Sequence, residues 1–372
     1  MKEGWTYKRL GDLCRIRTGK LDANAADDDG LYPFFTCSVT PLRINKYAYD
    51  CECVLVAGNG DLNVKYYSGK FNAYQRTYII ESNDKNVLDV RYLYMFLSEY
   101  VTILRKKSIG AIIKYIKLGY LTEAKLLLPP ISEQQSIVDY LNSAFAKIDT
   151  MKANAEKALN EAKALFQASL KEMLEPKEGW EEKNLGDICE IIRGKRFVRT
   201  DIIENGVPCI HYGDIYTHYG LSVKKTRGCI NPELAKKMRF AEKNDVVVVQ
   251  AGENNWDIGV GVAYFGEEPA AVHDACFILK HKQDPMYISY YLRSYNYHRY
   301  LVDYVHEGKI CSFLKPALEN APIPLPPFSE QQSIVATLDS LKSKVDRLQA
   351  NYDKISKECD ALKQAILRQV FE

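Results

Sequence analysis

The sequence has no long hydrophobic run and no excess of charge of either sign. No apolar stretch approaches the roughly 18 residues that a membrane-spanning helix needs, and no hydrophobic signal segment follows Met1. These absences argue against membrane and secreted proteins and predict a cytoplasmic location. The 50 basic residues are balanced by 48 acidic ones, which excludes a uniformly polybasic chain. The balance does not exclude a nucleic-acid-binding patch, because such a patch depends on local asymmetry.

Metal-binding patterns are also absent. The ten cysteines are scattered singly, and the closest two are Cys51 and Cys53. There is no C-x-x-C pair and no Cys/His spacing of a zinc module. The sequence therefore predicts reduced thiols and no metal site.

The motifs of common catalytic sites are missing as well. The chain has no H-E-x-x-H, no phosphate-binding G-x-x-x-x-G-K-[ST] and no G-x-S-x-G. All six histidines lie between His211 and His306, so the first half of the chain cannot hold a histidine-based site. His273-Asp274 is more simply a polar loop pair, and Glu123-Ala-Lys125 is a short match that arises often by chance. We therefore expect a non-catalytic chain.

What the sequence does contain is an internal repeat. Gly4-Trp5 recurs as Gly179-Trp180, which lies 175 residues further on. Leu10-Gly11-Asp12 and Gly19-Lys20 recur at the same offset, as Leu185-Gly186-Asp187 and Gly194-Lys195. The repeat predicts two related domains.

A second repeated block is closer still. Leu128-Pro-Pro-Ile-Ser-Glu-Gln-Gln-Ser-Ile-Val138 matches Leu325–Val335 at ten of eleven positions, 197 residues further on. The Pro-Pro pair disfavours helix before it, and Ser132-x-x-Gln135 and Ser329-x-x-Gln332 have the form of capping boxes. The block therefore predicts the start of a long helix in each copy.

Each of the two helices has apolar residues at alternating spacings of three and four. This heptad pattern predicts a paired coiled coil rather than two helices that merely cap their own domains. The predicted pairing residues are Leu141, Ile148, Met151 and Leu165 in the first helix, and Leu338, Leu341, Val345, Leu348, Ile355, Leu362 and Ile366 in the second.

The order of the segments constrains the fold. We expect an α+β protein with two similar α/β domains at residues 1–131 and 176–328, and with long helices at 132–175 and 329–372. The second domain joins the end of the first helix to the start of the second. If that domain is compact, the helices run antiparallel, and the two domains are related by a pseudo-two-fold axis.

The middle of each copy is less similar than its ends. Both contain an apolar strand-like run followed by a Gly/Asn turn, beginning at Val54 and Val247, and a short amphipathic helix, at Tyr92–Tyr100 and Tyr287–Tyr295. Similar ends with divergent middles suggest one scaffold that carries two different surfaces.

The divergent middles hold side chains that suit DNA base edges. Asn and Gln pair with adenine, Arg and Lys with guanine or phosphate, and Glu or Asp can accept from cytosine. For any single residue, turn chemistry or a solvated face is an equal alternative. The candidates are Lys20, Asn59, Asn63, Lys65, Tyr74, Gln75, Arg76, Arg193, Lys195, Arg196, His211, Tyr212, Asp214, Gln250, Glu253, Asn254, Asn255 and Trp256.

Taken together, the two repeated blocks resemble the specificity subunit of a type I restriction–modification enzyme over essentially the whole chain. The resemblance implies that each domain is a target-recognition domain for one half of an interrupted, asymmetric site in double-stranded DNA. It implies that the helical pair sets the gap and docks two methyltransferase (modification) subunits. S-adenosylmethionine, ATP and Mg²⁺ are expected on these and on separate restriction/motor subunits, and no cofactor is expected in this chain.

Two other functions are compatible with the sequence. A structural adaptor could bind proteins through its two domains, which would suit the 26 tyrosines and the near-neutral charge. A metal-dependent nuclease is the third alternative. DNA binding by the purified chain separates the first from the second, and DNA cleavage would indicate the third.

Overall fold

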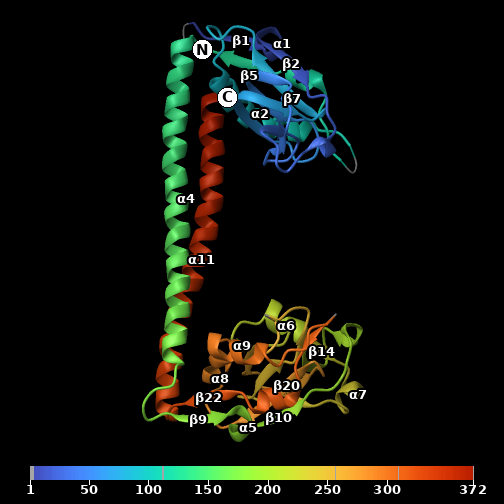
Figure 1. Cartoon of the computed structure of the whole chain (residues 1–372), viewed down its shortest axis with the longest axis vertical. Coiled ribbons are helices and arrows are strands. Elements are labelled where there is room, and N and C mark those ends of the chain that lie inside the picture. Colours follow the sequence, from blue (N-terminus) through green and yellow to red (C-terminus); the bar gives the residue numbers. More distant parts are fainter. Residues whose placement is uncertain (1–3, 111–112, 256, 309, 372) are drawn as a thin grey trace. The chain divides into compact units, whose positions relative to one another are not determined.

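The computed structural model describes residues 4–110, 113–255, 257–308 and 310–371. The chain divides into two compact units (Figure 1). Unit 1 contains the residues up to Glu156 together with those from Asn351 onward, and unit 2 is Lys157–Ala350. Two long helices, α4 (Ile131–Met173) and α11 (Phe328–Phe371), contribute to both units. The predicted mixed α/β class with two long helices is confirmed, whereas the exact domain boundaries stay a prediction.

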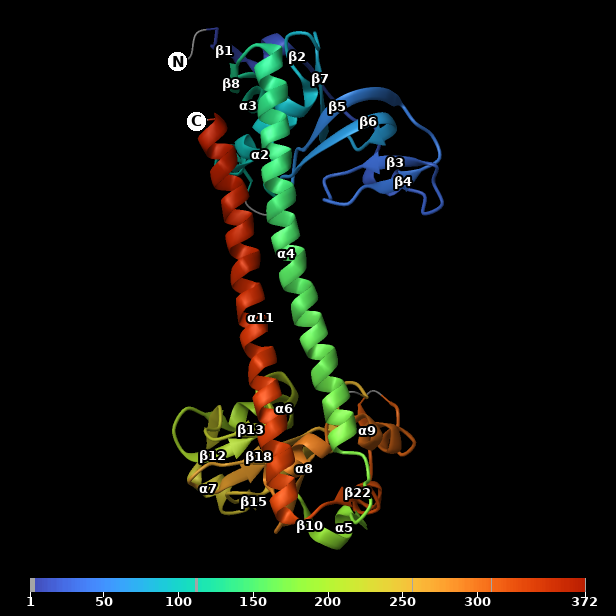
Figure 2. The same ribbon diagram turned by 90° about the vertical axis from the view of Figure 1, so that its left-hand side faces the viewer.

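Unit 1 is built on a six-stranded sheet in the order β2-β7-β5-β6-β3-β4. All its pairs are antiparallel except β3 with β6, which is parallel. The β5–β6 hairpin extends away from α2 and carries β3 and β4 at its far end (Figure 2). The strands are β2 (Cys14–Thr18), β3 (Tyr32–Phe35), β4 (Leu42–Ile44), β5 (Tyr49–Ala57), β6 (Val64–Ala73) and β7 (Thr77–Ser82).

The remaining elements of unit 1 surround this sheet. Strands β1 (Thr6–Arg9) and β8 (Lys125–Leu128) form a separate antiparallel pair. Helix α2 (Val90–Lys107) buries Leu93, Phe96 and Leu97. The short elements are α1 (Leu10–Leu13), the 3-10 turn Ala23–Ala25 and α3 (Leu118–Thr122).

Unit 2 repeats this plan with its sheet in two parts. The first part has the order β10-β20-β16-β18-β13 and the second β11-β14-β12-β19-β15. The first part consists of β10 (Cys189–Arg193), β20 (Cys276–His281), β16 (Val246–Val249), β18 (Gly261–Tyr264) and β13 (Ser222–Val223). The second part consists of β11 (Ile202–Ile203), β14 (Gly228–Ile230), β12 (Val207–Ile210), β19 (Ala270–Val272) and β15 (Phe240–Ala241).

Two further strand pairs and several short helices complete unit 2. They are β9 (Glu181–Asn184) with β22 (Pro322–Leu325), β17 (Ala251–Gly252) with β21 (Cys311–Ser312), α5 (Leu185–Ile188), the 3-10 turn Arg199–Asp201, α6 (Tyr212–Thr217), α7 (Pro232–Ala235), α8 (Pro285–Tyr291), α9 (Tyr295–Val302) and α10 (Lys315–Glu319).

The central strands follow from the apolar runs in the sequence. Val54–Ala57 in β5 and Val246–Val249 in β16 are fully buried, as expected of valine-rich apolar runs at the centre of a sheet. The predicted helix after the sheet is also present in both units. In unit 2 it is broken into α8 and α9, because Ser294 caps a new helix by accepting from the backbone of Tyr297.

The repeated Ser-Glu-Gln-Gln block forms the same corner in both units. Gln134 and Gln331 are buried, and their side-chain oxygens accept from the backbone of Asp89 and Asp284 at 2.9 and 3.0 Å. Their amide nitrogens donate to the carbonyls of Pro129 and Pro326. Each glutamine thus joins the start of a long helix to the start of the helix after the sheet.

A second duplicated contact closes the same corner. Trp5 donates to Glu133 at 3.1 Å, and Trp180 donates to Glu330 at 3.2 Å. These bonds explain why Trp and Glu recur in both copies. The predicted capping boxes are wrong, since α4 and α11 begin at Ile131 and Phe328 and their first serines lie inside the helix.

The long helices run antiparallel within each unit. In unit 1, Lys152 pairs with Asp360 at 3.5 Å, and Lys363 donates to Asp149 at 2.5 Å (Figure 2). In unit 2, Lys163 donates to Gln349 at 2.7 Å. Further along α4, Phe166 and Leu170 line a cavity together with Lys342, which precedes Gln349 on α11. The predicted antiparallel direction is confirmed within each unit.

Most, but not all, of the predicted pairing residues lie on the packed face of the long helices, which we call the seam. Leu141, Ile148, Leu338 and Val345 are buried, and Leu341, Leu348, Ile355 and Ile366 are half-buried. Met151, Leu165 and Leu362, however, are 60%, 59% and 48% exposed. On α4, the side chains that pack are Phe145, Lys152, Leu159 and Phe166, so the predicted Met151 and Leu165 each lie one residue too early.

Candidate nucleic-acid interface

In unit 1, several loops meet at the turn between β6 and β7. Its Tyr74 donates a backbone hydrogen bond to Phe35 at 2.9 Å. The carbonyl of Arg76 accepts from the backbone of Gly58 at 2.8 Å, and the backbone of Gln75 donates to Leu21 at 2.9 Å. The turn therefore lies between the loop after β2, the loop after β3 and the loop after β5.

The predicted site residues of unit 1 fall into two groups. Lys20, Gln75 and Arg76 are exposed in these loops, and Tyr74 and Asn59 are half-buried. Asn63 donates to the carbonyls of Cys37 and Asp61 at 2.8 and 2.9 Å, and Lys65 donates to Asn63.

Burial lowers the pKa of Lys65. Asn63 and Lys65 therefore hold the loop together. Gln75, although exposed, donates to Asp22, whereas Lys20 and Arg76 remain available to a ligand.

Unit 2 has the corresponding loop cluster. The backbone of His273 donates to Ile210 at 3.1 Å, and the carbonyl of Ala275 accepts from Gln250 at 2.8 Å. The structure thus brings the loops that contain Arg193, Lys195, His211 and Gln250 to one place. Lys195, Arg196, Glu253 and Asn254 are exposed there.

Several of the candidates in unit 2 are used internally. Gln250 is 7% exposed and donates to the carbonyl of Phe313 at 2.7 Å. Arg193 donates to the carbonyl of Asp274 at 2.9 Å, and Asp214 pairs with Arg227 at 3.3 Å. Asn255 donates to Glu307. Trp256 lies outside the described residues.

An aromatic cluster lies beneath the loops of unit 2. The ring of His211 is 4.4 Å from that of Tyr212 and 4.6 Å from that of His273, and Phe197 is 5.1 Å from His273. His211 is 5% exposed, and burial lowers its pKa to about 4. Burial also lowers the pKa of His273. Both rings are neutral near pH 7 and act as packed aromatic groups.

The sequence interpretation missed one basic segment. At the end of α2 and in the following loop, five cationic side chains are exposed: Arg105, Lys106, Lys107, Lys114 and Lys117. Arg105 also donates to the carbonyl of Leu62 at 2.6 Å, which connects this segment to the loop after β5. The sequence did contain this signal, because Arg105, Lys106 and Lys107 are consecutive in the last turn of the helix, and Lys114 and Lys117 follow in the loop. Such a segment suits DNA phosphates.

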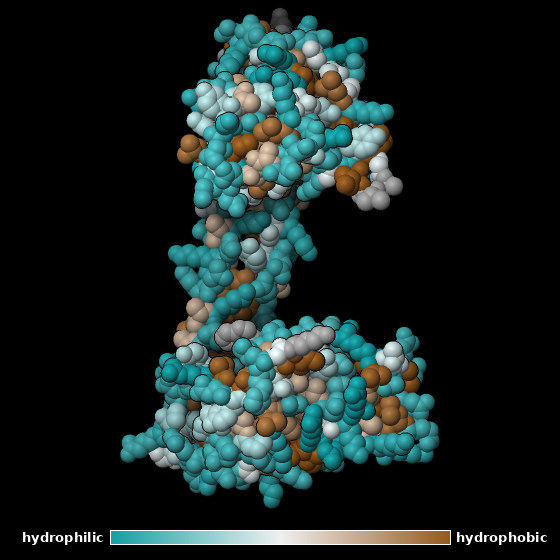
Figure 3. Space-filling model, turned by 45° about the vertical axis from the view of Figure 1, so that its right-hand side comes forward, coloured by the Kyte–Doolittle hydropathy of each residue, from teal (hydrophilic) through white to brown (hydrophobic). Residues whose placement is uncertain are grey.

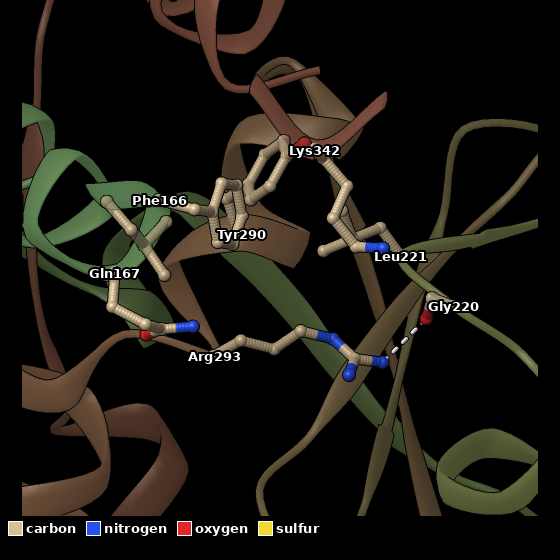
Figure 4. A pocket seen from close by; sticks show the side chains of 8 residues that line it. Phe166, Gln167, Gly220, Leu221, Tyr290, Arg293 and Lys342 are labelled. Atoms are coloured by element: carbon tan, nitrogen blue, oxygen red, sulfur yellow. Dashed lines mark hydrogen bonds between the residues drawn. The ribbon is translucent and has the colours of Figure 1, made fainter. Parts of the chain in front are cut away.

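The cavities of the structure do not suggest a site of another kind, such as a catalytic pocket. A cavity of about 260 Å³ in unit 2 lies between Phe166 and Leu170 of α4, Tyr290 of α8 and Lys342 of α11 (Figure 4). Arg293 points across it and donates to the carbonyl of Gly220 at 2.6 Å.

Within the described residues, no three His, Cys, Asp or Glu side chains gather as metal ligands, and no helix is long and apolar enough to cross a membrane. The face shown in Figure 3 is mostly hydrophilic, with scattered hydrophobic residues. These features leave the two loop clusters as the candidate site.

Comparisons with known proteins agree with the repeated plan. A family model described as the type I restriction modification DNA specificity domain matches residues 2–161 and again residues 177–357. The specificity subunit of the type I restriction enzyme EcoDI from Escherichia coli is 42% identical over 166 residues. That alignment covers 45% of this chain and only 37% of the relative's own length. The MjaVIII specificity subunit from Methanocaldococcus jannaschii is 23% identical over 95% of this chain and 90% of its own length.

Solved structures share the fold. One chain, from work on complex assembly and conformational transition of the type I R-M system, matches with a TM-score of 0.75 at 20% identity. The match covers 100% of this chain and 98% of the other. The HsdS subunit from Thermoanaerobacter tengcongensis matches with a TM-score of 0.60 at 20% identity, over 99% and 97% of the two chains. With its two matched domains, the chain belongs to the family of type I restriction–modification DNA specificity subunits.

Proposed function

We propose that this chain recognises an interrupted DNA sequence, with one half bound by the loop cluster of each unit. The observation that carries the proposal is that both units hold their loops with the same backbone hydrogen bonds but present different polar side chains. Two unlike half-sites would require this arrangement. The chain itself would supply recognition, and catalysis would lie on other subunits.

The two long helices would set the gap between the half-sites. Because α4 and α11 each contribute to both units, their length fixes how far one loop cluster can be from the other along DNA. The duplicated corner at Gln134 and Gln331 supports the predicted similarity of the two domains. Two modification subunits that bind S-adenosylmethionine would dock on the helical pair and neighbouring surfaces, and restriction/motor subunits would use ATP and Mg²⁺.

The basic segment of unit 1 would contact phosphates next to the first half-site. Each exposed lysine that neutralises a phosphate releases counterions, so binding should weaken steeply as salt rises. The bridge between Ile109 and Tyr115 recurs in unit 2 between His306 and Ser312, 197 residues further on. At that offset, the five cations of unit 1 are replaced by Val302, Asp303, Tyr304, Cys311 and Leu314. We therefore expect unit 1 to supply more of the salt-sensitive affinity.

The test is to co-express the chain with the modification subunits of its source cell and to sequence the methylated DNA. A single interrupted motif, absent when this chain is omitted, would support the proposal. A gel shift on random duplex DNA, with and without the modification subunits, provides the second measurement. If neither assay shows DNA recognition while the subunits still assemble, the adaptor alternative is favoured instead.

A further inference from the structure

The β6–β7 turn (Tyr74–Arg76) and the β19–β20 turn (His273–Ala275) are equivalent elements of the two units. Each has three residues and connects the strand parallel to β3 or β12 to the strand paired with β2 or β10. Each also lies at the centre of its loop cluster. We call both the shared turn.

The backbone of the shared turn is held by the same four hydrogen bonds in both units. In unit 1 they run from Tyr74 to Phe35, Thr77 to Tyr74, Gly19 to Thr77 and Gly58 to Arg76, at 2.8 to 3.1 Å. In unit 2 they run from His273 to Ile210, Cys276 to His273, Gly194 to Cys276 and Gln250 to Ala275, again at 2.8 to 3.1 Å.

Glycine is required beside the turn in both units. A Cβ atom on Gly19 would lie 2.1 Å from the carbonyl oxygen of Ala73, and one on Gly194 would lie 2.2 Å from that of His273. These distances are far inside van der Waals contact, so only glycine lets the two backbones approach. The repeated Gly-Lys pair thus has a structural role that is independent of what the loops bind.

The second and third side chains of the shared turn, in contrast, differ between the units. Unit 1 presents Gln75 and Arg76, both exposed, whereas unit 2 presents Asp274 and Ala275. Among the described residues, the guanidinium of Arg76 has no hydrogen-bond or ion-pair partner. The carboxylate of Asp274 is 33% exposed and contacts His273 of its own turn at 3.2 Å. Main-chain bonds fix the turn, and the side chain of Gln75 adds a hydrogen bond to Asp22. The side chains of Arg76 and Asp274 are not needed to hold the turn.

We propose that the shared turn is the specificity-determining element of each unit. In unit 1, Arg76 recognises guanine through its O6 and N7 acceptors. In unit 2, Asp274 accepts a hydrogen bond from the exocyclic amino group of cytosine or adenine. The proposal rests on the DNA recognition proposed above and adds which residues discriminate the bases.

The experiment compares Arg76→Ala, Arg76→Lys and Asp274→Asn in the complete complex with its modification subunits, using methylation-sensitive sequencing. Arg9→Ala is the matched control, because Arg9 is an exposed arginine of unit 1 on β1. We expect Arg76→Ala and Arg76→Lys to relax one guanine position in a single half-site by about tenfold to hundredfold. Asp274→Asn should relax a position in the other half-site, and Arg9→Ala should leave the motif unchanged.

Two results would overturn the proposal. Relaxation of neither half-site, with wild-type methylation intact, would show that the shared turn does not read bases. Uniform weakening at every sequence with a smaller salt dependence would show that Arg76 contacts phosphate instead. If Arg76→Ala does not fold, Arg76→Lys decides, since it keeps the charge and removes only the paired donors. A wild-type complex without any sequence preference would contradict the proposed function itself.

Discussion

Gln134 is completely buried and uses both ends of its amide. Its oxygen accepts from Asp89, and its nitrogen donates to the carbonyls of Val87 and Pro129, at 2.8 to 2.9 Å. The next residue, Gln135, is exposed on the same helix. A single repeated Gln-Gln pair therefore contains one residue with a structural role and one with none visible within the unit.

We expect Gln134→Ala to lower the free energy of unfolding by about 2 to 4 kcal/mol, because it leaves buried backbone groups without partners. Gln135→Ala should change it by less than about 0.5 kcal/mol. Denaturant unfolding of the purified chain measures both. Equal effects of the two substitutions would contradict the assigned role of Gln134.

His211 predicts a pH dependence of stability. Its pKa falls from 6.5 to about 4 on folding, mainly through burial, with a smaller contribution from His273. The unfolded chain therefore binds a proton that the folded chain does not. Stability is fully present above pH 6.5 and is lost as the pH falls toward 4.

Between pH 7.5 and pH 5 the loss should be about 2 kcal/mol from this residue. His211→Phe, which keeps an aromatic ring in the cluster, should remove that part of the loss. Thermal unfolding at the two pH values provides the measurement. The same pH response in both proteins would refute the assignment.

The sequence could name the polar side chains near the site but not their partners. Asn63 and Gln250 had the chemistry of base readers, yet both donate to backbone carbonyls inside their own unit. The sequence does not show which backbone carbonyls in a loop lack a backbone hydrogen-bond donor. His273 and Asp274 were interpreted as a polar loop pair. Asp274 became a candidate base reader only once the structure showed that its turn is equivalent to the Tyr74–Arg76 turn of unit 1.

At the scale of elements, the long helices show how a heptad pattern can place some pairing residues correctly and others one position too early. Positions such as Leu141, Ile148 and Val345 were correct because both possible seams share them. The alternative seam was signalled by Phe145, Leu159 and Phe166, which are bulkier than the residues one position earlier. It was hidden by Lys152 and Lys363, whose stems cover apolar surface while their amines pair with aspartates.

Leu159 and Leu165 form a matched pair on α4, with exposures of 3% and 59%. Leu159→Ala should lower the free energy of unfolding by about 2 to 4 kcal/mol, because it opens a cavity at the packed face. Leu165→Ala should cost less than about 0.5 kcal/mol. Urea unfolding followed by circular dichroism compares them. A larger effect at Leu165 would restore the seam predicted from the sequence.

At the scale of the whole molecule, the repeat was the strongest signal in the sequence. The Gly-Trp and Leu-Pro-Pro blocks predicted two related domains and two long helices, because both blocks recur in the same order, at offsets of 175 and 197 residues. They could not predict that the sheet of unit 2 is split. Nor could they predict that the helix after this sheet is divided into α8 and α9, with Ser294 capping α9. Those differences depend on insertions whose packing has no local pattern.

The proposed role of the helices predicts the effect of lengthening them. Seven residues inserted between Glu156 and Lys157, and seven between Ala350 and Asn351, keep nearly the same face toward the partner helix. At 1.5 Å a residue, the insertions add about 10 Å, or about three base pairs of DNA. The methylated motif should keep both half-sequences and gain about three base pairs of gap.

The control is the same insertion in α4 alone, which mismatches the two helices and should reduce methylation without producing a new gap. Methylation-sensitive sequencing of cells that express each variant gives the answer. An unchanged gap in the double insertion would show that the helices do not measure the distance between the half-sites.

The main-chain bonding of the shared turn has a consequence for how such proteins diversify. Gly19 and Gly194 must stay, and the carbonyl of the third turn residue must accept its bond, but neither demand restricts the neighbouring side chains. Most substitutions at positions 75, 76, 274 and 275 should therefore be nearly neutral for folding. A lineage could acquire a new target by single point mutations there, without passing through an unstable ancestor.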